Sequence, residues 1–241
     1  MENCDSCGER GDPKNVKKYV LELISGEPRL EVETKLATYA MISLAGIIVA
    51  FSLLASTVGI GKYLPFAILS AITGVCAAYC SSHLSCYRKS ISCMNGMMAG
   101  MTSGMIIGLM VGLVIGATNG MFIGSVAGAI AGIAIGAGIG RYCGVMGAME
   151  GIMAGFMGGT MGAMLSVMML NDNLMLFMVI AFAICIFMVG GLAYMMNKEQ
   201  GGVDKTLFKA SLARFLMFSV LFSVMMIAVI VYGPVGPITY F

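Results

Sequence analysis

The chain has 241 residues, of which 59% are hydrophobic and only 11% are charged, and it contains no Trp. A water-soluble domain carries about a quarter charged residues, so this composition excludes an ordinary soluble globular protein. The formal net charge of +2 and the lack of a concentrated basic patch beyond residues 14–18 give no indication of a nucleic-acid partner.

Residues 1–35 are polar and form the first predicted segment. The first apolar run starts too late for a cleavable signal sequence. Asp12 and Pro13 can begin a helix, Gly26 can end it, and the apolar residues between them share one face. We predict a cytoplasmic N-terminal segment with an amphipathic helix over 1–35, followed by a transmembrane bundle over 36–241 with a glycine- and Met-rich core at 93–170.

The rest of the chain consists of long apolar stretches between short polar segments. In lipid the backbone polar groups must pair internally, so such stretches are helices. We predict spans at 36–60, 63–80, 93–116, 121–140, 144–169, 174–196 and 207–232. This count puts thirteen of the fourteen Lys and Arg residues on the N-terminal side and only Lys62 on the other. Cytoplasmic loops are rich in Lys and Arg, so we expect the N-terminus inside and the C-terminus outside a plasma or cytoplasmic membrane.

Glycine occupies every fourth position from Gly96 to Gly144. Small residues at this spacing let helix backbones approach closely in lipid. As one helix the run would be about 73 Å long, far more than the hydrocarbon thickness of about 30 Å, so it must fold back, and 117–120 is the expected turn. The predicted fold is therefore an all-α integral membrane protein with about seven transmembrane helices and a glycine-zipper-packed central bundle.

Methionine, with 25 residues, is the second unusual component. In the fifth predicted span the methionines gather on one helical face, with glycines roughly opposite, over about 33 Å. Thioethers bind Cu(I) and Ag(I) but hold hard ions poorly, and weak ligands in series can pass an ion along. We predict that this face lines a path for a soft cation; the alternative is that Met simply fills space beside glycine. The ladder comprises Met146, Met149, Met153, Met157, Met161, Met164 and Met168, and a shorter stripe comprises Met94, Met97, Met98, Met101 and Met105.

Glu150 lies on the methionine side of the fifth span, two turns from its start. Ionisable residues in a span are costly and usually serve a cavity or a partner. A cation ligand, a proton-coupling group and an ion pair with Arg141 are the open interpretations.

Cysteines supply the second set of soft ligands. Seven of the eight fall on the predicted cytoplasmic side, where a reducing environment keeps thiols free. Cys80, His83 and Cys86 lie at the start of a predicted loop, and Cys93 begins the next helix. We predict these four as metal ligands, and the alternative is that they are ordinary buried or palmitoylated thiols. The Cys4-Asp-Ser-Cys7 pair is a weaker signal.

In its motif types the chain resembles the high-affinity copper uptake proteins, which combine Met-x3-Met pairs, GxxxG helix packing and a cytosolic Cys/His terminus. The counterparts are the Met149/Met153, Met153/Met157 and Met157/Met161 pairs, the glycine rows, and Cys80/His83/Cys86. The resemblance covers motif types only, since that family has three spans per subunit, and it implies copper handling without implying a mechanism.

Together these patterns predict a membrane transporter or accessory protein for a soft transition-metal ion, with Cu(I) favoured as the transported or bound ion. The predicted metal residues are Cys80, His83, Cys86, Cys93, Met146, Met149, Glu150, Met153, Met157 and Met161. The lipid bilayer, further copies of the chain and a cytosolic metal chaperone are the expected partners. No catalytic motif is present, so we expect no enzyme. The alternative is a glycine-zipper structural or channel-forming membrane protein with no metal role, and a metal sensor using the N-terminal CxxC would leave the spans unexplained.

Overall fold

The computed structural model describes residues 38, 40–43, 45–46, 64–86, 93–199 and 205–233. The chain divides into two compact units, Met1–Tyr39 and Ala40–Phe241, and all helices discussed below belong to the second. The predicted amphipathic segment 1–35 and most of the predicted first span, 36–60, lie outside the described residues.

Six long helices and two short 3-10 turns make up the described part of the second unit, and no strand occurs in it. They are α3 (Leu64–Cys86), α4 (Cys93–Asn119), α5 (Met121–Gly140), η2 (Arg141–Cys143), α6 (Gly144–Met168), η3 (Met169–Asn171), α7 (Leu174–Glu199) and α8 (Lys205–Tyr232).

Four segments in the described ranges are long and apolar enough to cross a membrane. They are Pro65–Ser82, Cys93–Asn119, Met121–Met168, which contains both α5 and α6, and Leu174–Ala193. A shorter apolar segment, Phe215–Ile230, lies within α8. The fold is therefore all-helical in its described part and compatible with a helical membrane protein.

Several helices extend beyond their predicted bounds, and two of these extensions, in α4 and α3, change a predicted turn or loop. Helix α4 continues to Asn119, so the predicted four-residue turn reduces to Gly120, whose φ of 94° suits a residue without a side chain. Helix α3 continues to Cys86, so the predicted loop after Cys80 was wrong. Ser81 donates its hydroxyl back to the Ala78 carbonyl at 3.1 Å, and no Gly or Pro interrupts the helix before Cys86.

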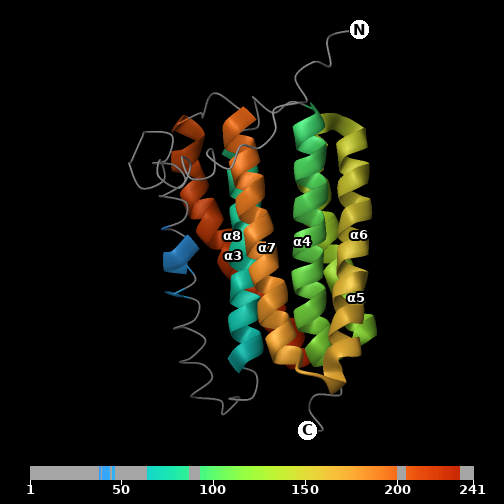
Figure 1. Cartoon of the computed structure of the whole chain (residues 1–241). Helices are drawn as coiled ribbons and strands as arrows, with labels where there is room; N and C mark the ends of the chain where they lie inside the picture. The colour runs from blue at the N-terminus through green and yellow to red at the C-terminus, as the bar shows by residue number, and fades with distance from the viewer. Residues whose placement is uncertain are drawn as a thin grey trace, which may run out of the picture. The chain divides into compact units, whose positions relative to one another are not determined.

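Helices α4, α5 and α6 run side by side (Figure 1) and touch at their glycines. A Cβ on Gly108 of α4 would lie 2.8 Å from the Gly155 carbonyl oxygen of α6, and one on Gly132 of α5 would lie 2.7 Å from the same oxygen. Real Cβ atoms do not come this close to backbone, so only glycine fits these positions. The space between the three helices is filled by backbone and by small side chains such as those of Ala163 and Ser166.

Helix α3 packs mainly against α8, and both helices also contact α4. Asn119, the last residue of α4, joins the two groups, because its side-chain amide donates to the Val229 carbonyl of α8 at 3.1 Å. The buried core is densest along α4, where Ile107, Met110, Leu113 and Val114 are fully buried. Helix α4 is thus the central element of the described bundle.

Candidate functional site

The methionines of α6 project outward from the bundle. Met146 is 71% exposed, Met164 is the least exposed at 49%, and the other five lie between these values. The α6 glycines on the opposite side are buried against α4 and α5. The predicted separation of a methionine face from a glycine face is therefore present in the structure. The methionines do not point into the interior of the single chain.

Helix α4 adds methionines beside those of α6. Its exposed members are Met94, Met98, Met101 and Met105. A Cβ at Gly158 of α6 would meet the backbone of Met105 of α4, so this stripe lies directly along the contact between the two helices. We call the exposed methionines of both helices the methionine face. It comprises Met94, Met98, Met101, Met105, Met146, Met149, Met153, Met157, Met161, Met164 and Met168.

Glu150 is exposed on this face, without the ion pair considered from the sequence. Arg141 is exposed as well, and its guanidinium carbon lies 5.7 Å from the centre of the Tyr142 ring. Both residues are described, and no salt bridge joins them within 4.0 Å. A carboxylate on an otherwise apolar helix face has to reach the headgroup region, a second protein surface or a cation.

Cys93 and Cys143 meet at the end of the bundle where α4 and α6 begin. The Cys93 thiol donates to the Cys143 carbonyl oxygen at 3.6 Å. Cys93 is exposed and Cys143 is half-buried. The sequence predicts both cysteines on the cytoplasmic side but groups Cys93 with Cys80, His83 and Cys86. The common starting side of two parallel helices was the signal that could have identified the pair.

The remaining described cysteines lie inside the bundle. Cys80 is only 1% exposed, Cys185 of α7 is buried, and Cys76 is half-buried. The side chains of His83 and Cys86, and all of Cys4 and Cys7, lie outside the described residues. The described part contains no cluster of three or more His, Cys, Asp or Glu that could hold a metal. The Cys80–His83–Cys86–Cys93 ligand set remains a prediction.

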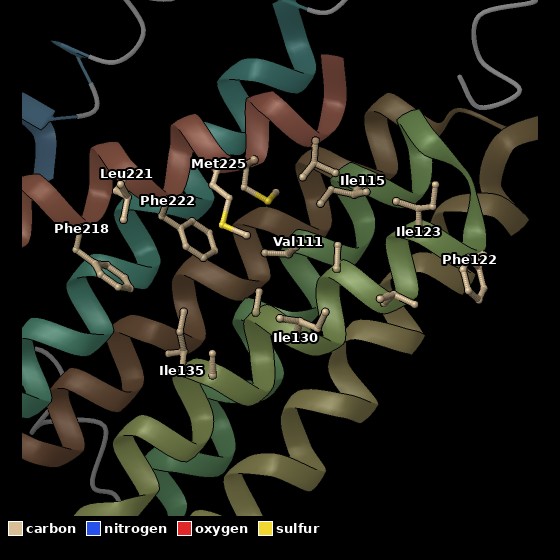
Figure 2. Close-up of a pocket in the computed structure, with 16 residues that line it drawn as sticks. Val111, Ile115, Phe122, Ile123, Ile130, Ile135, Phe218, Leu221, Phe222 and Met225 are labelled. Carbon is tan, nitrogen blue, oxygen red and sulfur yellow. The ribbon is translucent and has the colours of Figure 1, made fainter. Parts of the chain in front are cut away.

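An apolar groove of about 500 Å³ lies between α5 and α8, with α4 at its base. Figure 2 shows Phe222 and Met225 of α8 facing Ile130 of α5 across it. No titratable side chain lines the groove. It offers space for an acyl chain or an apolar side chain, and its only soft donor atoms are the thioethers of Met225 and Met226.

Two serine hydroxyls of α8, those of Ser219 and Ser223, are buried without a hydrogen-bond partner. They face α3 at Gly74, where a Cβ would overlap the Ser223 hydroxyl. Most other buried hydroxyls bond back to their own helix, as Ser103 does to Ala99 at 2.6 Å. Helices α3 and α8 are therefore in close contact, and two buried hydroxyl groups of α8 have no hydrogen-bond partner.

Comparisons with protein-family models, with curated proteins and with solved structures found no match.

Proposed function

We propose that this protein is a membrane transporter, or an accessory protein, for a soft monovalent metal ion, with Cu(I) as the first candidate. The observation that supports the proposal is the methionine face, an uninterrupted row of accessible thioethers. From Met146 to Met168 it covers about 33 Å along α6, comparable to the hydrocarbon thickness of a bilayer. Thioethers favour Cu(I) and Ag(I) over the hard ions that dominate cells.

The path would have to be completed by a second copy of the chain. Within one chain the space between α4, α5 and α6 is closed by glycine contacts, and the thioethers point outward. A lipid-facing row could not stabilise a cation, and it would leave Glu150 against acyl chains. We therefore place the path between the methionine faces of neighbouring copies.

The proposal also includes the membrane topology predicted from the sequence. Seven spans, a glycine-zipper core and a cytoplasmic N-terminus would put the starts of α4 and α6 on the cytoplasmic side. Cys93 and Cys143 would then stand where the methionine face meets the cytosol, which is also where a metal chaperone would deliver or receive the ion.

A second function has its own supporting observation. The glycine contacts hold α4, α5 and α6 together without any help from methionine. Methionines are exposed elsewhere too, for example Met188 of α7 and Met217 of α8, and lipid-facing residues need only be apolar. In this alternative the chain is a structural or channel-forming membrane protein with no metal role.

Ion flux into proteoliposomes separates the two functions. The test protein is M149L/M153L/M157L, and its matched control is M175L/M188L/M217L, which removes three exposed thioethers outside the methionine face. The transport proposal predicts Ag(I) or Cu(I) uptake by the wild type and by the control, with a loss of at least tenfold in the test variant. Equal uptake by both variants would eliminate the methionine face as a route.

A further inference from the structure

The positions of Cys93 and Cys143, fifty residues apart in sequence, are held by the glycine contacts beside them. A Cβ on Gly100 of α4 would lie 3.0 Å from the Gly140 Cα at the end of α5. A Cβ on Gly147 of α6 would lie 3.1 Å from the Cys143 Cβ. The turn that carries Cys143 is thereby packed closely against both neighbouring helices. Cys143 is held by these contacts, and the thiol of Cys93, the first residue of α4, reaches its carbonyl oxygen.

This pair is also the most accessible one among the described thiols. Cys93 is exposed, whereas Cys80 and Cys185 are buried within the bundle. Met94 and Met146, next in sequence or one turn away, are 65% and 71% exposed. An ion arriving from water would therefore meet these sulfurs before any other described thiol.

The chemistry of the pair favours one class of ion. Zn(II) requires about four ligands, and no third His, Cys, Asp or Glu joins the two thiols in the described residues. Soft monovalent ions such as Cu(I) and Ag(I) are selected by thiolates and thioethers and are satisfied by few ligands. Each thiol would release its proton on binding, which would leave one negative charge on the site.

We propose that Cys93 and Cys143 form a two-sulfur site that binds one Cu(I) ion at the cytoplasmic end of the methionine face. The orientation and the choice of Cu(I) rest on the proposed function. The site itself does not require that the face conducts ions, so the two proposals can fail separately.

The test measures how many Cu(I) ions each chain of the purified protein binds under reducing conditions, in competition with a Cu(I) chelator. The variants are C93S, C143S, C93S/C143S and M149L/M153L/M157L, with C185S as the matched control. Because both thiols would hold the same ion, either single serine variant is expected to lose one tightly bound Cu(I), and the double variant is expected to lose no more. C185S and the methionine variant are expected to retain that ion, whatever the flux measurement shows.

Unchanged stoichiometry in C93S and C143S would overturn the site, and so would losses that add up to two ions in the double variant. Loss of the same ion from the methionine variant would assign it to the thioethers instead. If a serine variant fails to fold, protection of the wild-type thiols gives an independent result. One equivalent of Cu(I) should shield both Cys93 and Cys143 from maleimide, as read by mass spectrometry, and alkylation of either at the metal-free rate would reject the pair.

Discussion

A Cβ placed on Gly112 of α4 would lie only 2.5 Å from the carbonyl oxygen of Gly159 of α6. The two parallel helices thus touch through backbone atoms, and α5 touches both of them at Gly128. This contact leaves room only for small side chains between the helices, such as those of Ala163 and Ser166. The larger residues of α4 and α6 therefore lie either against other helices or on the outer surface, where the methionine face is found.

Adding one methyl group to this contact should destabilise the bundle. In Gly132→Ala the new Cβ would overlap the Gly155 carbonyl oxygen, and overpacking of this kind costs about 1–3 kcal/mol. Gly190→Ala on α7 is the matched control, since its Cβ would meet nothing within 4 Å and alanine is the better helix former. Thermal unfolding in detergent should show a lower midpoint for the first variant and an equal or higher one for the second. Equal midpoints for both would mean that the helices are not in backbone contact.

The turn at Gly120 provides a different test, because its restriction is conformational. A Cβ there would contact nothing within 4 Å, but the φ of 94° disfavours any L side chain. Gly120→Ala is expected to lower the free energy of unfolding by about 1–3 kcal/mol. Gly120→Asn should cost as much, because φ 94° with ψ 168° lies outside the left-handed helical region that Asn tolerates. An unchanged free energy of unfolding in Gly120→Ala would show that the strain assigned to this turn is absent.

The sequence was sufficient to locate most helix ends but not the register between helices. The predicted bounds of α5 agree with the structure, because Gly120 and the segment at Arg141 interrupt an otherwise even apolar run. Glycine at every fourth residue leaves the register open, since a slip of four residues aligns glycines again. The two turns set the register. Paired glycines of α4 and α5, such as Gly104 and Gly136, lie at equal sequence distances from Gly120. Paired glycines of α5 and α6 lie at equal sequence distances from the point between Cys143 and Gly144.

The candidate site was predictable only in part, for similar reasons. Helical periodicity placed the α6 methionines on one face, but periodicity cannot indicate what that face meets. The loop expected after Cys80 was wrong because serines can pair with their own helix and need not end it. The contact between Cys93 and Cys143 depends on the packing of α4 against α6, which the register determines. Sequence spacing places both cysteines on the side where α4 and α6 begin, but it does not show that they are in contact.

The unpaired hydroxyl of Ser223 predicts a substitution that stabilises the protein. A buried hydroxyl without a partner costs about 1–3 kcal/mol, and Ser223→Ala removes it. We expect the unfolding midpoint to rise. Ser103→Ala is the control, since it removes a hydroxyl that donates to Ala99 at 2.6 Å and should give no such gain. A lower midpoint for Ser223→Ala would show that this hydroxyl has a partner in the membrane.

Asn119 should hold the end of α8 to the turn between α4 and α5. Asn119→Leu removes the donor to the Val229 carbonyl, which retains its helical bond from the Gly233 amide at 2.9 Å. The expected cost is about 1 kcal/mol, with faster hydrogen exchange confined to the C-terminal turns of α8. Exchange that rises equally in α3 and α7 would indicate general destabilisation and not the loss of a local tie.

The central claim is that the methionine face borders a water-accessible path between copies of the chain and not the acyl chains of lipid. The most direct test is the reaction of Met157→Cys, in membranes, with a charged thiosulfonate reagent that does not partition into lipid. Val179→Cys on α7, 63% exposed but outside the methionine face, is the control. We predict rapid modification at 157, protection of that thiol by Ag(I), and no modification at 179. If position 157 resists the charged reagent and reacts only with a lipid-soluble maleimide, as position 179 should, the face is in lipid and the transport proposal is contradicted.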